Sequence, residues 1–319
     1  MGLPAETLPP QMRRLLLLLV PCLLCSLAAL LVVRPARACS ICGSDDPLVS
    51  AGNSAPAVGA LRAALSASAV TASARSDDDP LVTERLERLQ LTPTLVYSPF
   101  LKLNLVAAVP LQRNLYSATG SDIASESHTL WGLGDAQLGA GYFIVDRVDF
   151  SAGSRQELAL SAGSAFPTGP NDSKADGERL DEHAQLGRGA FGPYAGITYA
   201  FHMDPWNFTA SVIGRTFTTN DLGYRYGSSL LWSAALQYRP WTELAFELGT
   251  NDHYELHDAL DGDKQVNTGG LVVQASPGLL AQVSGKLWFS ASVEIPVYTQ
   301  LNGQQQLGPT YLAVFRYAF

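Results

Sequence analysis

The sequence is poor in charge and in cysteine, and these shortages exclude several classes of protein. Asp, Glu, Lys and Arg make up 16% of the 319 residues, and only four residues are cysteine. Acidic residues outnumber basic ones by 29 to 21, which argues against nucleic acid as a partner. Two of the cysteines lie in the N-terminal apolar stretch, and the two that remain are too few for a closed zinc site.

Long apolar runs are also absent once the N-terminal stretch has ended. Beyond Cys42 no apolar run approaches 18 residues, so we expect no membrane-spanning helix in the rest of the chain. The hydrophobic content is nevertheless 47%, which is enough for a large buried or lipid-facing surface. The many Gly and Ser residues argue against a helical bundle.

Catalytic signatures are missing as well. A hydrolase needs a Ser or Asp nucleophile with a His base within reach. None of the five histidines, which are His128, His183, His202, His253 and His257, belongs to a GxSxG or HExxH motif. We therefore predict no catalytic residues, no cofactor and no metal site, and a hydrolase is kept only as a minor alternative.

The first 38 residues have the features of a secretion signal. Two arginines precede a long apolar stretch, and Ala36-Arg37-Ala38 forms the small-x-small pattern that signal peptidases cut. We predict a signal peptide at 1–38, with a retained membrane anchor as the alternative because the stretch is long enough to span. Removal takes four arginines and one glutamate, so 17 basic and 28 acidic residues remain and the net charge becomes −11.

A short segment with two cysteines follows the predicted cleavage point. We assign 39–57 to a periplasmic N-terminal segment in which Cys39 and Cys42 are candidates for a disulfide, as expected in an oxidising compartment. Cys39 and Cys42 could equally remain free thiols without a specific role, and a metal-binding or redox role is the alternative. No His follows Cys42, which excludes a c-type haem site.

Residues 58–319 alternate between apolar and polar with a period of two, the spacing of half-buried antiparallel strands. In 287–297, for example, Leu287, Phe289 and Val293 share one side, and Ser290 and Glu294 the other. The pattern predicts twelve strands, although Pro277-Gly278 could be a bulge or a turn that would change the count to ten or fourteen. The predicted strands are 58–73, 86–98, 101–112, 132–145, 149–166, 187–202, 206–218, 225–239, 242–252, 268–282, 286–299 and 308–319.

The connections between these strands alternate between long and short. Six long links and five tight turns, with an even strand count, are typical of a bacterial outer-membrane barrel, whereas a soluble sandwich has no reason to sort its loops by length. We therefore predict an all-β, transmembrane, antiparallel up-and-down β-barrel of about 12 strands in the outer membrane, with lipids as its surroundings. Aromatic residues near the short turns suit a membrane-interface girdle: Tyr97, Phe100, Tyr142, Phe143, Phe201, Trp206, Tyr238 and Trp241.

The C-terminus supports the same prediction. The last strand must pair with the first in a closed barrel, and its outer face must be apolar. Phe315, Tyr317 and Phe319 supply that face while Val314 and Arg316 would point inward. A terminal Phe after alternating aromatics also resembles the signal that the outer-membrane assembly machinery recognises, so we expect this machinery as a partner through Phe319.

Polar residues opposite the apolar faces are predicted to line the lumen. A cation facing lipid at mid-bilayer would cost about 2–4 kcal/mol, which favours the inward placement. Twelve strands lie between the filled eight-stranded and the open sixteen-stranded barrels, so a narrow solute path and a plugged interior both stay open. The predicted lumen residues are Arg88, Gln90, Lys102, Asn104, Asp135, Gln137, Arg155, Glu157, Arg215, Gln237, Arg239, Glu243, Glu247, Glu294 and Arg316.

Two long links are rich in acidic residues and histidine. The stretch 251–263 contains His253, Glu255, His257 and Asp258 and could bind a cation, but we favour a hydrated loop because no EF-hand spacing is present. The stretch 171–185, with Glu182 and His183 among its charged residues, is likewise expected to face outward and be hydrated.

Several stretches together resemble a family of outer-membrane transporters labelled "MetA-pathway of phenol degradation". The resemblance rests on "CSICGSDDPL" from residue 39, on "FPTGP" and "GERLDEHAQLGRGAFGPYAGITY" over 166–199, and on the aromatic terminus. It implies an outer-membrane barrel that admits small hydrophobic or aromatic compounds, and it brings no catalytic residues. Ser44 stands where relatives often have a further cysteine, which weakens a metal role, and "AQLGRGA" also departs from the usual run.

These observations lead to one functional hypothesis and one rival. We expect passive transport of a small-molecule solute through the barrel, with selectivity set by the lumen charges and the longest loops. The rival is a structural or adhesive outer-membrane barrel with a plugged lumen, whose loops bind surface partners.

Overall fold

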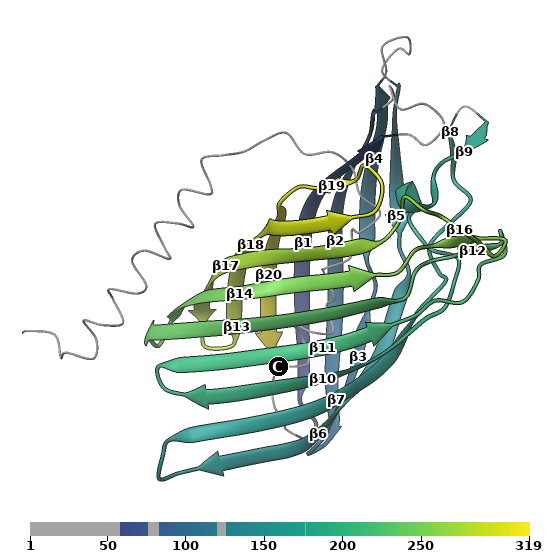
Figure 1. The fold of residues 1–319 in the computed structure, drawn as a ribbon. Coiled ribbons are helices and arrows are strands. Elements are labelled where there is room, and N and C mark those ends of the chain that lie inside the picture. The colour runs from purple at the N-terminus through teal and green to yellow at the C-terminus, as the bar shows by residue number, and fades with distance from the viewer. Residues whose placement is uncertain (1–57, 76–82, 120–125, 176) are drawn as a thin grey trace, which may run out of the picture. The chain divides into compact units, whose positions relative to one another are not determined.

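The computed structural model describes residues 58–75, 83–119, 126–175 and 177–319, and Figure 1 shows the path of the chain. Within these ranges the regular structure is antiparallel β-strand apart from a single 3-10 turn, η1, at Glu182–Ala184. No helix in these ranges has the length and apolar character needed to cross a membrane. The predicted signal peptide, the segment 39–57 and the pair Cys39 and Cys42 lie outside the described residues.

Twelve antiparallel strands in the described residues form one closed wall, which confirms the predicted all-β barrel. Two of these twelve wall strands are interrupted and ten are continuous. The continuous ones are β1 (Leu61–Arg75), β2 (Thr83–Phe100), β7 (Ser154–Phe166), β10 (Gly192–Met203), β11 (Trp206–Arg215), β13 (Ser229–Trp241), β14 (Leu244–Glu255), β17 (Gly270–Ser284), β18 (Leu287–Leu301) and β20 (Thr310–Ala318).

Each interrupted wall strand has two halves, β3 (Leu103–Ala108) with β4 (Leu111–Thr119), and β5 (Glu126–Leu133) with β6 (Ala136–Asp149). β3 pairs with β6, and β4 pairs with β5. Pro93 of β2 lies opposite the first interruption, between the pairs Leu91↔Leu111 and Thr94↔Ala108. A proline has no N–H to donate, so it fits where the ladder is already broken.

The first and last strands close the barrel. β1 pairs with β2 from Leu61↔Tyr97 to Arg75↔Thr83, and its other edge pairs with β20 from Arg62↔Ala318 to Ala69↔Tyr311. Full pairing of both edges satisfies the backbone groups that an open sheet would leave exposed to lipid. This closure is the reason for the aromatic terminus, because β20 belongs to the lipid-facing wall.

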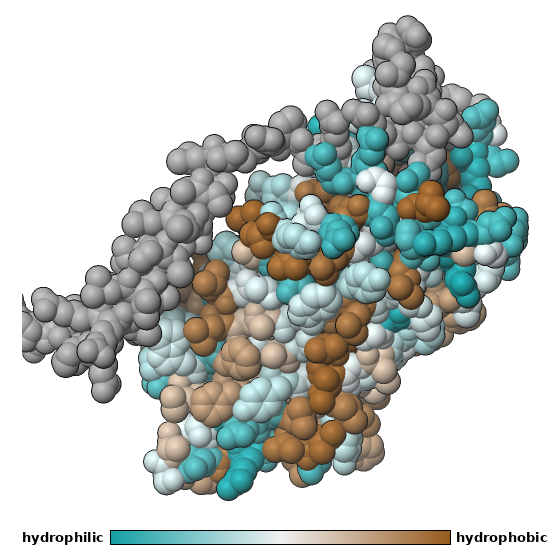
Figure 2. Space-filling model, in the orientation of Figure 1, coloured by the Kyte–Doolittle hydropathy of each residue, from teal (hydrophilic) through white to brown (hydrophobic). Residues whose placement is uncertain are grey.

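Side chains alternate between the two faces as predicted. Along β20, Tyr311, Phe315 and Phe319 are 57%, 48% and 65% exposed, whereas Val314 is 3% exposed. Figure 2 shows apolar side chains gathered over the strand wall and hydrophilic ones over the region of the loops. Among the predicted girdle aromatics, Phe143 is an exception, since it is 2% exposed and faces the interior because its neighbours Tyr142 and Ile144 take the outer positions.

Long loops and short turns gather at opposite ends, which we call the long-loop end and the short-turn end. Turns of two to four residues, such as 101–102 and 150–153, close one end, and loops such as 167–191, 216–228 and 256–269 close the other. Pro277-Gly278 forms no turn, because β17 runs through it and pairs Pro277 with Leu248, so the count stays at twelve.

Short strands stiffen the long loops. β8 (Lys174–Ala175) pairs with β9 (Glu178–Arg179). β15 (Ala259–Leu260) pairs with both β12 (Tyr224–Arg225) and β16 (Asp263–Lys264), so it joins two different loops. β19 (Gln306–Leu307) pairs with Ala72 and Ser73 near one end of β1. The long-loop end is therefore folded structure rather than a set of independent hydrated segments.

Candidate functional site

One side of the bore is filled by apolar packing across its width. Val96 and Val106 from β2 and β3 form a buried cluster with Tyr194 and Ile213 from β10 and β11. The Tyr194 ring lies over glycines of β6 and β7, and a Cβ at Gly163 would overlap with its hydroxyl. This packing occupies the part of the bore between β2–β3 and β10–β11.

The loop 167–191, which we call the plug loop, folds into the bore at the long-loop end. Its Leu180 and Ala184 form a buried cluster with Leu86, an inward-facing residue of β2, and Tyr116 and Leu130 of β4 and β5 pack against it. Apolar contacts with inward residues of three strands place this loop inside the wall.

Hydrogen bonds from the wall hold the backbone of the plug loop. Arg88 Nη2 donates to the carbonyl oxygen of His183 at 2.9 Å. Asn114 Nδ2 donates to the carbonyl oxygens of Ala184 and Gln185 at 2.9 and 3.0 Å. Because buried carbonyl groups need donors, these two wall side chains satisfy a segment that would otherwise lose hydration inside the bore.

The base of the plug loop is fixed to the second interrupted strand. The Asp135 carboxylate accepts from the backbone N–H of Gly169 at 3.0 Å and of Arg188 at 2.8 Å. Thr168 Oγ1 donates to the Gly134 carbonyl at 3.1 Å and accepts from the Ala136 N–H at 2.8 Å. The wall interruption between β5 and β6 thus anchors the start of the loop through its backbone groups and both ends of the loop through the Asp135 carboxylate.

Three loops meet at a group of polar side chains, His183, Tyr224 and Asp258, which we call the latch. His183 Nε2 lies 3.0 Å from Asp258 Oδ2, and the Tyr224 hydroxyl donates to the same oxygen at 2.5 Å. The Gly227 N–H donates to Asp258 Oδ1 at 2.6 Å. The Asp258 side chain is 1% exposed, so its charge depends on these partners.

The latch residues hold opposite charges near neutral pH. Burial lowers the pKa of His183, but the hydrogen bond to Asp258 and the charges of Asp181, Asp258 and Glu255 outweigh it and raise the pKa to about 8. Burial raises the pKa of Asp258, but the bonds from His183, Tyr224 and Gly227 keep it below its ordinary value. Charged His183 and Asp258 therefore form a partly buried ion pair that joins the plug loop to the loop 256–269.

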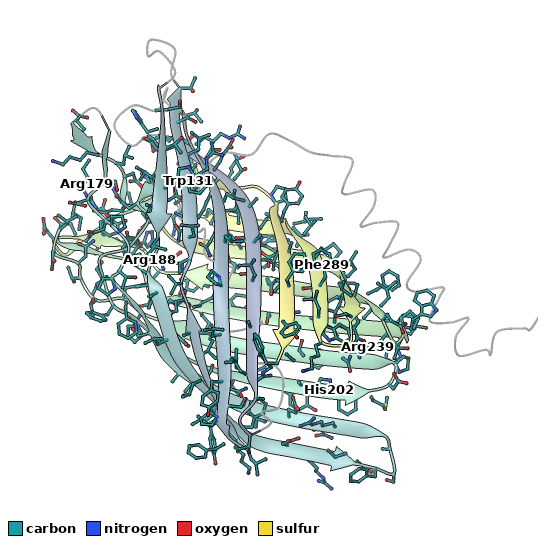
Figure 3. All side chains as sticks on the ribbon, turned by 180° about the vertical axis from the view of Figure 1, so that it is seen from behind. Trp131, Arg179, Arg188, His202, Arg239 and Phe289 are labelled. Atoms are coloured by element: carbon teal, nitrogen blue, oxygen red, sulfur yellow. The ribbon has the colours of Figure 1, made fainter. Side chains whose placement is uncertain are left out.

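Arginines reinforce the same end. Arg179 Nη1 and Nη2 donate to the two Glu182 carboxylate oxygens at 2.7 and 2.6 Å, a bidentate pair. The Arg188 guanidinium lies 4.6 Å from the centre of the Phe217 ring and 5.3 Å from that of Tyr226. Figure 3 shows Arg179 and Arg188 at one end of the barrel, and His202 and Arg239 toward the other.

Between the two ends lies a cavity of about 320 Å³ with both polar and apolar lining residues, which we call the chamber. Carboxylates of Glu247 and Glu294 and the imidazole of His253 line it, and His253 is 4% exposed with no hydrogen-bond partner for either ring nitrogen among the described residues. Its hydroxyl-bearing residues are Ser66, Thr209, Ser211, Ser233, Thr250, Ser276, Ser290 and Ser292.

At the short-turn end a second cavity, which we call the vestibule, has a volume of about 300 Å³. Its charged lining residues are Arg62, Arg239, Lys286 and Arg316, and no carboxylate-bearing residue lines it. The chamber and the vestibule share Arg316 and Leu280 as lining residues, so the two cavities adjoin. A third cavity of about 370 Å³ lies on the other side of Arg239 and includes Asp149, Arg155 and Asp204.

The structure separates the predicted lumen residues by role. Glu247, Glu294, Arg239 and Arg316 line the chamber or the vestibule. Arg88 and Asp135 instead fix the plug loop. Gln237 also lines the chamber, and several others contact further residues: Asn104 accepts from Arg62, Arg155 pairs with Glu157, and Arg215 lies over the Tyr194 ring.

Two predicted lumen residues lie elsewhere. Lys102 and Glu243 are exposed in short turns, because β3 begins at Leu103 and β14 at Leu244, later than the predicted strand starts at 101 and 242. The period-two pattern runs on through the turn in both places, since an apolar residue flanks each charge. Both side chains are exposed and line neither the chamber nor the vestibule, so the prediction of a lumen position is wrong for these two.

Sequence reasoning also missed residues that shape the interior at both ends. The prediction of an outward, hydrated 171–185 stretch is wrong for Glu182 and His183 of the plug loop, and the corresponding expectation is wrong for Asp258 of the loop 256–269, since all three side chains are buried or half-buried and paired with other residues. Within the described ranges no group of three or more His, Cys, Asp or Glu side chains is arranged to hold a metal. Lys286 and Trp288 escaped notice because each appears in sequence as an ordinary residue beside a turn.

The fold defines the class of the protein, and comparison with known proteins defines its family. The closed twelve-stranded wall with an apolar exterior makes it an outer-membrane β-barrel. Residues 44–305 match the family described as "Putative MetA-pathway of phenol degradation", and the chain belongs to that family. The resemblance seen in the sequence is thereby confirmed.

A solved outer-membrane channel supports the fold. The chain is similar to the COG4313 outer membrane channel from Pseudomonas putida F1, with a TM-score of 0.63 and 14% identity over 83% of this chain and 97% of that one. It is more distantly similar to the translocator domain of autotransporter NalP from Neisseria meningitidis, with a TM-score of 0.45 and 13% identity over 86% and 93% of the two chains. No curated protein matches the sequence.

Proposed function

We propose that this barrel is a passive outer-membrane channel for small molecules, with its long loops outside the cell and its short turns in the periplasm. The observation that carries the proposal is the pair of adjoining cavities, chamber and vestibule, inside the closed wall. Volumes of about 320 and 300 Å³ are at the lower end of ordinary small-molecule pockets. A solute of one or two rings, or a short polar chain, fits that space.

The lining of the chamber favours solutes that form hydrogen bonds. Carboxylates and hydroxyls surround the space, and the unpartnered imidazole of His253 offers one donor and one acceptor. A hydroxylated or phenolic compound would replace hydration there, whereas a pure hydrocarbon would leave buried polar groups unsatisfied. The small hydrophobic or aromatic compounds implied by the family fit best when they carry a polar group.

A second candidate is the plugged structural barrel, and the plug loop itself favours it. The bonds of Arg88, Asn114 and Asp135 to the plug loop are numerous enough to keep one end closed. In the proposed channel the plug loop acts as a gate, and in the structural barrel it is permanent. The two readings differ only in whether the closed state opens on a useful timescale.

Liposome swelling with the purified full chain tests the proposal. Vesicles that contain the protein should swell in small polyols, amino acids and phenolic compounds and should exclude disaccharides and larger solutes. Planar-bilayer recordings should show current in the same preparation. An absence of both swelling and current would favour the plugged structural barrel instead.

A further inference from the structure

The vestibule contains a concentration of positive charge that the proposed channel does not by itself explain. Arg62, Arg239, Lys286 and Arg316 come from β1, β13, the β17–β18 turn and β20, so four separate parts of the wall converge on one cavity. Like charges in a confined space repel each other, which is costly unless an anion lies between them. Four cations around one cavity therefore need a source of negative charge to offset their repulsion.

Among the described residues, no carboxylate of the vestibule lining fills that role. No Asp or Glu of the described residues lies within 4.0 Å of a side-chain nitrogen of Arg239, Lys286 or Arg316. Carboxylates that share a cavity with these arginines line the adjoining spaces: Glu247, which acts electrostatically on Arg316, lies in the chamber, and Asp149 with Asp204 lies in the cavity beyond Arg239.

The guanidinium groups also have unused donors. The Nε atoms of Arg239 and Arg316 are buried and have no hydrogen-bond partner in the described structure. Arg316 Nη1 has only a long bond of 3.4 Å to Ser290 Oγ. Arg62 is already engaged, since it donates to Ser98 and Asn104 at 3.3 and 3.1 Å, so it contributes charge rather than free donors.

The rest of the vestibule is apolar. Val96, Leu280 and the indole of Trp288 line it, and the Arg239 guanidinium lies 5.4 Å from the centre of the Trp288 ring. An apolar wall beside planar cationic groups suits a ligand with two parts, a carboxylate for the guanidinium forks and an apolar or aromatic body for the indole side.

We propose that the vestibule is a binding subsite for small organic anions, in which Arg239, Lys286 and Arg316 hold a carboxylate and Trp288 with Leu280 contacts the body of the solute. The role of the subsite in transport rests on the proposed function. There it narrows the expected solutes to aromatic or apolar carboxylates. Arg316, shared by both cavities, would transfer the anion between the chamber and the periplasmic mouth.

Equilibrium binding in detergent micelles tests the subsite without requiring a current. Isothermal titration of the full chain with sodium benzoate should give saturable binding that weakens as salt is raised. Benzyl alcohol, which has the same ring and no charge, should bind weaker by roughly tenfold or more, the loss expected for one charge-assisted hydrogen bond. Equal binding of the two probes would overturn the proposal.

Matched variants locate the site. Lys286→Gln, Arg239→Gln and Arg316→Gln should each weaken benzoate by roughly tenfold. Lys102→Gln should leave it unchanged, since Lys102 is exposed in a turn at the same end and lines neither cavity. Lys286 also lies in a turn, so its variant keeps the test valid if a wall arginine is needed for folding. If Lys102→Gln weakened benzoate binding to the same degree, the effect would come from the net charge of the protein, and the assignment of the subsite to the vestibule would be contradicted.

Channel recordings separate this inference from the proposed function. Benzoate binding with the expected variant pattern but without any current supports the subsite and contradicts the channel. Current that benzoate does not reduce, together with absent micelle binding, supports the channel and contradicts the subsite.

Discussion

The two ends of the bore are closed by different physical means. At the long-loop end the plug loop brings its own backbone into the barrel, and almost every polar group there has a partner, as at Asn114 and Asp258. At the short-turn end the wall carries cationic side chains around free space, and two guanidinium Nε atoms lack partners. A satisfied network resists opening, whereas unsatisfied charge attracts a ligand, so one end is suited to gating and the other to selection.

Removal of the plug loop should change the difference between the two ends most strongly, because it opens the long-loop end. Gly187 N–H donates to the Pro170 carbonyl at 2.9 Å, so the ends of the loop are close enough to be joined by two glycines in place of 171–186. We expect the single-channel conductance to rise several-fold, because a bare twelve-stranded bore lies between the filled and the open barrel sizes. Planar-bilayer recordings measure the change, with heat-dependent gel migration as the control for folding. Unchanged conductance would show that the loop does not restrict the bore.

A single substitution at the latch should act in the same direction with a smaller effect. Asp258→Asn leaves His183 and Tyr224 without their charged partner, and removal of one member of a buried pair typically costs about 3–5 kcal/mol. We expect frequent opening transitions in bilayer recordings. Asp263→Asn is the matched control, because Asp263 is exposed in the same loop. Equal behaviour of the two variants would contradict the role of the latch.

The latch also predicts a pH dependence whose sign is fixed. The pKa of His183 in the folded protein is raised to about 8. The stabilisation of the latch by charged His183 is therefore complete below the ordinary pKa near 6.5 and is lost as the pH rises through 8. That shift corresponds to about 2 kcal/mol at most. Channel opening should therefore increase between pH 6.5 and 8.5, and His183→Gln should abolish the change. If channel opening in the unmutated protein did not change with pH, ionisation of His183 would not control the opening.

The filled side of the bore offers a test of packing. Gly163→Ala places a methyl group against the Tyr194 hydroxyl and the Leu138 carbonyl, and overpacking of this kind costs about 1–3 kcal/mol. Gly141→Ala on the neighbouring strand is the control, since the nearest atom to its Cβ would be 4.0 Å away. Denaturant unfolding in lipid vesicles should separate the two variants. Equal midpoints would mean that Tyr194 moves aside without cost.

The mildest expected change concerns ion preference. Glu247→Gln removes a chamber charge while keeping a partner for Gln237 Nε2, which donates to Glu247 at 2.6 Å, so reversal potentials should shift toward anions. Glu243→Gln should have no such effect because Glu243 is exposed in a turn. Identical reversal potentials in both variants would count against Glu247 as a lumen charge that permeating ions feel.

How well the sequence predicted each region depended on the range of the interactions. The wall was predictable because strand alternation is local, and the inward position of Val314 beside the outward Phe315 follows from period two alone. The turn positions of Lys102 and Glu243 were missed by one or two residues, the usual uncertainty of an element boundary. The plug was mispredicted because charged residues in a long link are ordinarily hydrated.

Patterns of neighbouring residues were sufficient to predict a closed antiparallel barrel with an apolar exterior, an aromatic final strand and loops sorted by length. What fills the bore depends on contacts between residues far apart in the chain and was seen only in the folded protein. Arg88 meets the backbone of His183 across 95 positions and Asp258 meets His183 across 75, and neither contact has a local signature. Charges that are far apart in the chain became neighbours because the wall closes, which is how isolated arginines and one turn lysine came to surround a single cavity.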